Sequence, residues 1–151
     1  DSAGWKAFGK RLGKIATFYR GEGYSFGWHN HDFEFVALPD GKIPHEVMFK
    51  AAPLLDWEID VAWVIRGGAD PLKYIKKYAA NITSAHVKDI APKGKNADED
   101  GWADVGHGTV DYKPIIAALK KTRLRHHVLE HDKPADAARF AKRSFETVSK
   151  L

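Results

Sequence analysis

The chain has 151 residues, the size of one domain able to bury a core of its own. Hydrophobic residues make up 44% and charged residues 29%, as in an ordinary globular domain, and the absence of cysteine excludes a disulfide framework or a thiolate metal site. The formal net charge is +4, but the basic residues are dispersed and form no basic arm, so we expect no nucleic-acid partner. No apolar run approaches the ~20 residues of a membrane span, so we also expect no membrane partner and a cytoplasmic location.

Helical segments are predicted from apolar periodicity and from capping residues. Apolar residues recur at steps of three and four from Trp5 to Tyr19, which predicts an amphipathic helix over residues 3–20, ended by Gly21 and Gly23. The pair Asp70-Pro71 predicts a capped helix with proline in its first position. Three more helices are predicted over residues 44–52, from Asp111 to Leu119, and from Asp132-Lys133-Pro134 to about Ser149.

Four short apolar runs between these helices predict strands, at residues 24–29, 55–60, 83–88 and 126–130. Strands that alternate with helices favour right-handed crossovers and a parallel sheet. A long polar connection, residues 89–110, separates the third strand from the next helix. Connections of this length without secondary structure are usually functional, so we expect residues 91–108 to move as a lid over a site.

Each predicted strand has a residue that can bind a metal at its end or, in the third strand, two residues before its end. These residues are His29, Asp60, His86 and Glu130. The carboxyl ends of parallel strands share one rim of the sheet, so we expect the four side chains to converge there. Two imidazoles and two carboxylates suit one divalent metal of intermediate hardness, such as Mn²⁺, Co²⁺, Zn²⁺ or Fe²⁺. One strand-end histidine is more often a hydrogen-bonded rim residue, but four potential ligands at four consecutive strand ends favour a metal site.

Five segments between Tyr24 and the C-terminus, GWHNHDFEF, WEIDVAWV, SAHVKDI, ADVGHGTVDY and VLEHDKP, resemble the sugar phosphate isomerase/epimerase superfamily, which has a xylose isomerase-like TIM-barrel fold. The resemblance implies an α/β fold of βα repeats, with residues 1–151 forming a single partial barrel domain. We therefore expect the C-terminal half of the barrel, βα units 5–8 preceded by one helix, with four parallel strands and five to six helices. By the same resemblance, Asp60, His86 and Glu130 match the family's metal ligands.

Two positions depart from the family pattern. His29 stands where family epimerases usually have a glutamate that is also one of two catalytic bases. A histidine can still bind the metal, so we still expect a metal. Because the carboxylate base is absent, the type of reaction is left open. His31 lies two residues further on the same strand face and could replace His29 as the ligand or contact substrate. Trp63 stands where family members often have a histidine; it is either a wall for a sugar ring or a packed rim aromatic.

Other polar residues near the strand ends have two interpretations each. Lys88 is either a cation that stabilises an enediolate oxygen or an ordinary exposed lysine. His107, among glycines of the long connection, either contacts substrate or is satisfied by solvent. Glu58 shares a strand face with Asp60 and is a candidate for orienting a metal ligand. The remaining histidines have no converging partners and are interpreted as structural or as pointing away from the metal: His45, His126, His127 and His131.

The expected activity is that of a divalent-metal-dependent isomerase or epimerase acting on a sugar or keto-sugar through a metal-stabilised enediolate, with Glu130, His29 and Lys88 as catalytic residues. The alternative enzyme is a sugar lyase or dehydratase, because expulsion of a β-hydroxyl uses the same ligands. A non-catalytic barrel fragment that keeps the ligands is the alternative from another class.

A half-barrel of four strands would have two unpaired strand edges and, we expect, an exposed apolar inner face. The expected partner is therefore a second copy that closes the barrel as a homodimer, or a missing N-terminal half-barrel.

Overall fold

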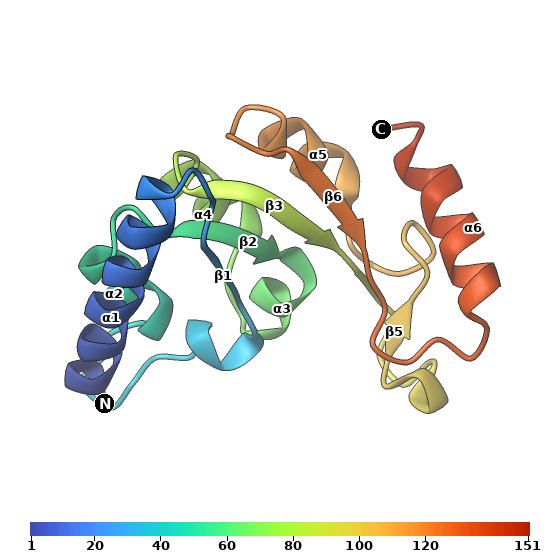
Figure 1. Cartoon of the computed structure of the whole chain (residues 1–151). Helices are drawn as coiled ribbons and strands as arrows, with labels where there is room; N and C mark the ends of the chain where they lie inside the picture. The colour runs from blue at the N-terminus through green and yellow to red at the C-terminus, as the bar shows by residue number, and fades with distance from the viewer.

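The computed structural model describes all 151 residues and contains one parallel sheet of four strands in the order β1-β2-β3-β6. Every neighbouring pair in this sheet is parallel, as the alternation of strands and helices predicts. The sheet arches through the molecule between α1 and α2 at one end and α6 at the other (Figure 1). Its strands are β1 (Gly27–His29), β2 (Asp56–Asp60), β3 (Ile82–Val87) and β6 (His126–Leu129).

The predicted helices are present, with one addition. The six helices are α1 (Ser2–Gly21), α2 (Pro44–Ala51), α3 (Val61–Arg66), α4 (Pro71–Lys77), α5 (Tyr112–Leu119) and α6 (Ala137–Val148). The short helix α3 was not predicted, and it begins directly where β2 ends because the side chain of Asp60 caps it. The start predicted for α6 is wrong by about one turn, since Asp136 and not Asp132 caps that helix. None of the helices is both long enough and apolar enough to span a membrane.

One face of the sheet carries the apolar core. Trp57 and Ile59 of β2 are fully buried, as are Ala85 and Val87 of β3. They belong to one cluster of 20 buried residues that also includes side chains from α1, α2, α3, α4 and α5. The helices therefore cover this face, and burial of its apolar surface is the main force that holds the sheet in place.

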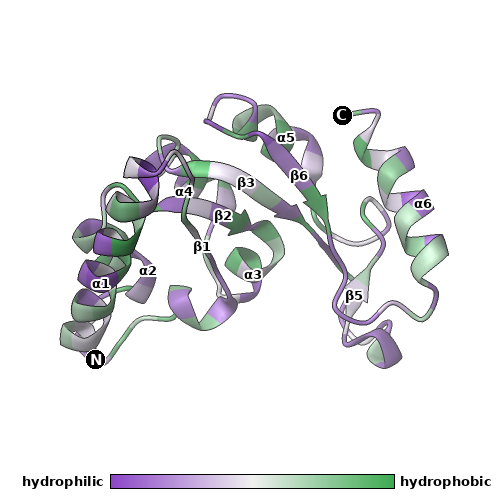
Figure 2. Ribbon diagram, viewed as in Figure 1, coloured by the Kyte–Doolittle hydropathy of each residue, from purple (hydrophilic) through white to green (hydrophobic).

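The opposite face of the sheet is polar, so the expectation of an apolar inner face is wrong. Residues paired across parallel strands point to the same side, and one such row runs from His29 through Glu58 and Ser84 to His126. In the next row, Asp60 pairs with His86. In Figure 2 the ribbon of β6 is hydrophilic over most of its length and hydrophobic at its end.

The long connection after β3 has secondary structure, so the expectation of a structureless segment is wrong. Within it, β4 (Asp89–Ile90) pairs antiparallel with β5 (Trp102–Ala103), and a 3-10 turn, η2 (Ala97–Glu99), lies between them. The fully buried carboxylate of Asp89 accepts backbone N–H groups from Gly106, Gly108 and Val110, which fixes the second half of the connection.

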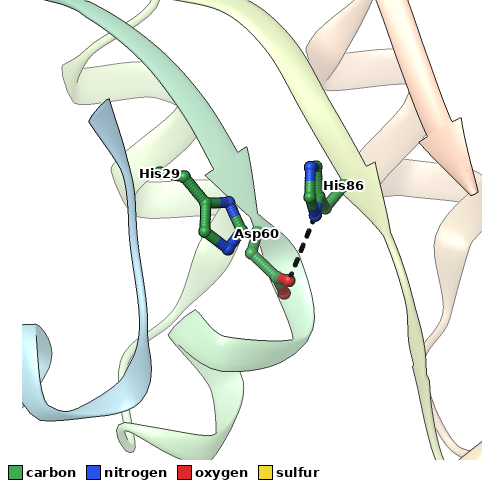
Figure 3. Close-up of side chains that lie close together, drawn as sticks. All are labelled: His29, Asp60 and His86. Atoms are coloured by element: carbon green, nitrogen blue, oxygen red, sulfur yellow. Dashed lines mark ion pairs between the residues drawn. The ribbon is translucent and has the colours of Figure 1, made fainter. Parts of the chain in front are cut away.

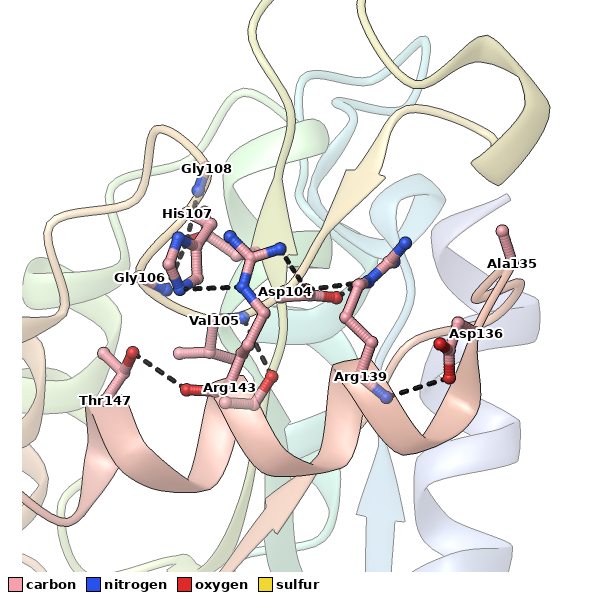
Figure 4. Close-up of polar contacts among 12 residues, drawn as sticks. Asp104, Val105, Gly106, His107, Gly108, Ala135, Asp136, Arg139, Arg143 and Thr147 are labelled. Atoms are coloured by element: carbon pink, nitrogen blue, oxygen red, sulfur yellow. Dashed lines mark hydrogen bonds and ion pairs between the residues drawn. The ribbon is translucent and has the colours of Figure 1, made fainter.

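The connection is also tied to α6 by ion pairs (Figure 4). Asp104 is almost fully buried, and its carboxylate lies 3.0 Å from Nε of Arg139 and 2.8 Å from Nη1 of Arg143. Arg139 also reaches Glu99 of η2 at 2.7 Å. These contacts hold the connection against the C-terminal helix, so movement of residues 91–108 as a lid would have to break them.

Candidate metal centre

His29, Asp60 and His86 converge at the carboxyl ends of β1, β2 and β3 (Figure 3). One ligand atom from each residue can be chosen so that all three lie within 4.8 Å of one another. The two imidazole rings have centroids 4.3 Å apart, and Nδ1 of His86 lies 3.8 Å from Oδ2 of Asp60. This spacing is suited to a single cation held between the three side chains.

Burial sets the protonation of two of these groups. It lowers the pKa of His29 to about 4, with a further contribution from the charge of His86. The imidazole of His29 is therefore neutral near pH 7, which is the form that binds a metal. Burial also raises the pKa of Asp60 to about 6, because the charged carboxylate loses water that no other group replaces fully.

His86 lies between three carboxylates. Its Nδ1 faces Asp60 and also lies 3.3 Å from Oε2 of Glu130, while its Nε2 lies 3.0 Å from Oε1 of Glu58. Burial alone would lower the pKa of His86, but the hydrogen bond with Glu130 and the charges of Glu58 and Asp60 raise it overall. One ring nitrogen thus faces the ligand cluster and the other faces an orienting carboxylate, as is usual for metal-binding histidines.

Glu130 follows β6 directly and contacts His86, but it is not one of the three residues whose ligand atoms all lie within 4.8 Å of one another. Its carboxylate lies 2.9 Å from Nζ of Lys88, and the same ammonium contacts Asp132. The hydrogen bond with His86 and the contact with Lys88 hold the pKa of Glu130 far below its usual range. Glu130 is therefore a carboxylate near neutral pH and is available to a metal or a substrate proton.

Lys88 is fully buried, so its interpretation as an ordinary exposed lysine is wrong. Its Nζ lies 4.2 Å from the ring centroid of Trp102 and 5.0 Å from that of Trp63, in addition to the two carboxylates. The guanidinium of Arg66 covers Trp102, with Cζ 3.2 Å from the ring centroid. Two tryptophans and two cations thus form one wall beside the ligand cluster.

His31 lies next to the cluster and not within the group of three. Its ring is 5.0 Å from the ring of His29 and 5.5 Å from that of Trp63, measured between centroids. It stacks on the exposed ring of Phe33 with an angle of 7° between the planes. His31 and Trp63 therefore flank the mouth of the cluster together, and the geometry favours His29 over His31 as the ligand.

The donor atoms of the cluster are of the kind that a cation would bind. Nδ1 of His29 and Oδ2 of Asp60 are buried and have no hydrogen-bond partner. Buried polar atoms without a partner are rare because each costs desolvation free energy, and a cation bound by these two atoms would offset that cost. Neutral imidazole nitrogen and carboxylate oxygen are also the donor types that divalent transition metals take.

His107 is not brought to the cluster. Its Nε2 accepts a hydrogen bond from Nε of Arg143 at 3.3 Å (Figure 4), and it lines a cavity of about 270 Å³ with Asp104 and Arg139. The other histidines also lie elsewhere. His45 is fully buried among aromatic rings, His131 packs against Phe140, and His126 and His127 are exposed on β6.

Two buried polar residues beside the candidate site were not predicted from the sequence. Asn30 and Glu34 are both fully buried, and both contact the backbone of residues at the strand ends. Oε1 of Glu34 accepts from the backbone N–H of His31 and Oε2 accepts from Nε1 of Trp28, so it supports the HNH segment from both sides. Polar residues inside an aromatic run, HNHDFEF, were the available signal, because such residues are buried only with partners.

No protein-family model matches the sequence. Among curated proteins, the chain is similar to inosose dehydratase from Clostridium perfringens, with 21% identity over 83% of this chain and 46% of the relative, and to inosose dehydratase from Clostridium beijerinckii, with 23% identity over the same shares. The chain thus spans about half the length of the curated relatives that it matches.

The chain also covers about half of each solved structure to which it is similar. Two sugar phosphate isomerase/epimerase structures from Parabacteroides distasonis superpose with TM-scores of 0.80 and 0.77, at 17% and 23% identity, over 98% and 100% of this chain but 52% and 55% of theirs. A probable 3-DHS dehydratase involved in petrobactin synthesis in Bacillus anthracis superposes with a TM-score of 0.74, at 17% identity, over 95% of this chain and 56% of its own. The chain therefore has the α/β fold of about half of a sugar phosphate isomerase/epimerase of the xylose isomerase-like, TIM-barrel type, as the sequence predicts.

Proposed function

We propose that the chain carries the metal centre of an enzyme that removes a proton from a carbon next to a carbonyl of a sugar or keto-sugar. The observation that carries the proposal is the convergence of His29, Asp60 and His86 with two buried ligand atoms that have no hydrogen-bond partner. Glu130 would complete a set of four ligands. A divalent metal, such as Mn²⁺, Co²⁺, Zn²⁺ or Fe²⁺, would polarise the substrate carbonyl and so make the neighbouring C–H more acidic.

The other roles in the reaction, namely substrate binding, charge stabilisation and proton transfer, would fall to different side chains of the chain. His31 and Trp63 flank the mouth and would hold the sugar ring or chain against an aromatic surface. Lys88, which faces Glu130, would place a positive charge beside the oxygen that becomes negative in the enediolate. Glu130 or the neutral His29 would take the proton, since both are unprotonated near pH 7. His107 would contribute only after leaving Arg143, so we do not assign it to the resting site.

Return of the proton to the substrate gives isomerisation or epimerisation, which we take as the first candidate reaction. Dehydration is the second candidate, in which the same enediolate would expel a β-hydroxyl group, and the base would return the proton it took to the leaving oxygen so that water departs. It is favoured by the two inosose dehydratases and the probable 3-DHS dehydratase among the proteins similar to this chain.

A second set of four strands would complete the barrel. β1 and β6 each pair on one side only, and an unpaired strand edge is a template for pairing with another chain. A TIM barrel needs eight strands, which is twice the number present here. We propose that a second copy of the chain closes the barrel as a homodimer, and that a separate N-terminal half-barrel is the alternative partner.

The proposal is tested by proton NMR in D₂O on a panel of keto-sugars and inososes, with protein loaded with Mn²⁺, Co²⁺ or Zn²⁺. We expect loss of the signal of one C–H proton, followed by an epimer, an isomer or a dehydrated product. His86→Ala should abolish both metal binding and exchange, whereas Lys88→Met should keep the metal and lose exchange.

His126→Ala is the matched control, because His126 is exposed on the same inner face, in register with Ser84, and makes no hydrogen bond or ion pair with the cluster. It should retain exchange. Metal binding without exchange on any substrate would support a non-catalytic fragment that keeps its ligands, and absence of saturable metal binding would contradict the proposal.

A further inference from the structure

Asn30 lies between the two histidines of the HNH segment, yet its side chain turns away from the solvent and is fully buried. Its carboxamide makes three hydrogen bonds. Oδ1 accepts from the backbone N–H of Asp60 at 2.9 Å and from Nε1 of Trp57 at 2.9 Å, and Nδ2 donates to the backbone oxygen of Asp60 at 3.1 Å. Both backbone groups of Asp60 are therefore held by one side chain from the end of the neighbouring strand.

The orientation of the Asp60 backbone determines where its carboxylate points. It is the last residue of β2 and also the N-cap of α3, where Oδ1 accepts from the backbone N–H of Trp63 at 2.9 Å. With Oδ1 engaged in this way, Oδ2 is the oxygen left facing His86. A rotation of the Asp60 backbone would move both oxygens, so the direction of Oδ2 depends on what holds the N–H and C=O of this residue.

We propose that Asn30 is the positioning residue of the candidate metal centre, and that it sets the spacing between His29 and Asp60. His29 precedes Asn30 directly in the chain, so a side chain clamped to Asp60 fixes one candidate ligand relative to the other. This inference rests on the proposed function, because a positioning role has a meaning only if the cluster binds a metal.

The pair of hydrogen bonds between Asn30 and the backbone of Asp60 requires a carboxamide. Asn30 uses an acceptor for the N–H of Asp60 and a donor for its carbonyl, and asparagine has both on one planar group. Aspartate at this position would keep the acceptor, lose the donor, and place a negative charge against the carbonyl oxygen. Alanine would lose all three hydrogen bonds and leave the buried indole N–H of Trp57 without its acceptor.

Asn81 is the matched control, since it makes the same kind of contact at the opposite end of β2. Its Nδ2 donates to the backbone oxygens of Pro53 and Leu55, at 3.1 Å and 2.8 Å. Asn81→Ala therefore removes backbone hydrogen bonds from the segment that leads into β2, at the end of the strand away from the cluster. It separates a loss of general stability from a loss of ligand geometry.

The test measures Co²⁺ affinity by titration calorimetry, the visible absorption spectrum of the Co²⁺ protein, and the urea midpoint of the metal-free protein. We expect Asn30→Ala and Asn30→Asp to weaken Co²⁺ binding about 10- to 100-fold, the range typical of residues that orient ligands, and to change the visible spectrum. Asn81→Ala should lower the urea midpoint but keep the wild-type affinity and spectrum. Asn30→Asp keeps two of the three hydrogen bonds, so it provides the test if the alanine variant does not fold.

The outcomes are distinguishable. If the wild-type protein binds Co²⁺ and both Asn30 variants match it in affinity and spectrum, the positioning role is overturned and the proposed metal centre stands. If the Asn81 control loses affinity as much as the Asn30 variants do, the effect comes from stability and the positioning role is again overturned. If the wild-type protein binds no Co²⁺, the metal centre itself is overturned, and the inference with it.

Discussion

Oε1 of Glu58 lies 3.0 Å from Nε2 of His86, on the side of the imidazole opposite to the nitrogen that faces Asp60 and Glu130. A carboxylate in this place fixes the orientation of the ring and makes the other nitrogen a better electron donor. Glu58 is also the cross-strand neighbour of His29, so it contacts two candidate ligands from one position.

The first prediction concerns this carboxylate. Glu58→Gln removes the charge and keeps the size of the side chain, and it should weaken binding of Zn²⁺ or Mn²⁺ about 10- to 100-fold, less than His86→Ala does. Titration calorimetry measures the difference. Glu46→Gln removes a carboxylate that pairs with Lys77 far from the cluster, and it should leave the metal affinity unchanged. Equal affinities of Glu58→Gln and the wild type would contradict an orienting role.

The second prediction separates the two histidines of the HNH segment. Nδ1 of His29 is buried without a partner, whereas the ring of His31 stacks on the exposed Phe33. His29→Ala should therefore abolish saturable metal binding. His31→Ala should keep the metal affinity within about threefold and raise KM for the substrate, because it removes one of the two rings that flank the cluster. The reverse order of the two metal affinities would identify His31 as the ligand.

The third prediction concerns the ion pairs that hold the long connection against α6. Asp104 is 3% exposed and pairs with Arg139 and Arg143, so Asp104→Asn leaves two guanidinium groups facing a neutral amide. Both arginines are partly exposed, and we therefore expect a loss of about 1–3 kcal/mol in the free energy of unfolding, measured by urea denaturation. Asp98→Asn, at an exposed position of η2, should lose almost nothing. Metal affinity should stay unchanged in both variants.

The fourth prediction is a pH dependence that originates in His45. Burial lowers the pKa of His45 to about 3 in the folded protein, from about 6.5 when it is exposed. Only the unfolded state takes up a proton between these values, so stability is complete above pH 6.5 and falls as the pH decreases, by about 2 kcal/mol at pH 5.

His45→Phe should remove this loss, because phenylalanine has no proton to gain and the site is already lined by aromatic rings such as those of Phe49 and Trp57. The measurement is the difference in unfolding free energy between pH 7.5 and pH 5, for the variant and the wild type. A difference that is the same in both proteins would show that other groups cause the acid sensitivity.

The fifth prediction concerns assembly. The unpaired edges of β1 and β6 should pair between two copies, so light scattering at micromolar concentration should give twice the 16.9 kDa mass of the chain. Exposed aromatic residues near the edge strands support a buried interface there, among them Tyr24 and Phe33 beside β1. A single-chain mass together with a cooperative thermal transition would contradict the homodimer and leave a separate half-barrel as the partner.

Local patterns in the sequence determined the elements and the ligand types. Apolar steps of three and four predict α1, and aspartate caps predict the starts of α4 and α5, because these signals act within one turn of helix. His29, Asp60 and His86 could be predicted as neighbours, since strands joined by helices run parallel and their carboxyl ends meet at one rim.

The tertiary structure alone decided which side chains are buried around these ligands and which contacts hold them. The sequence left Lys88 open between two interpretations, and the approach of Glu130 and Trp102 from distant segments buries it. The role of Asn30 depends on the backbone of a strand 30 residues later, and His107 is directed away from the cluster by an arginine of α6. Local propensity acts over a few residues, whereas burial and hydrogen-bond partners are set by contacts between segments that only the folded chain brings together.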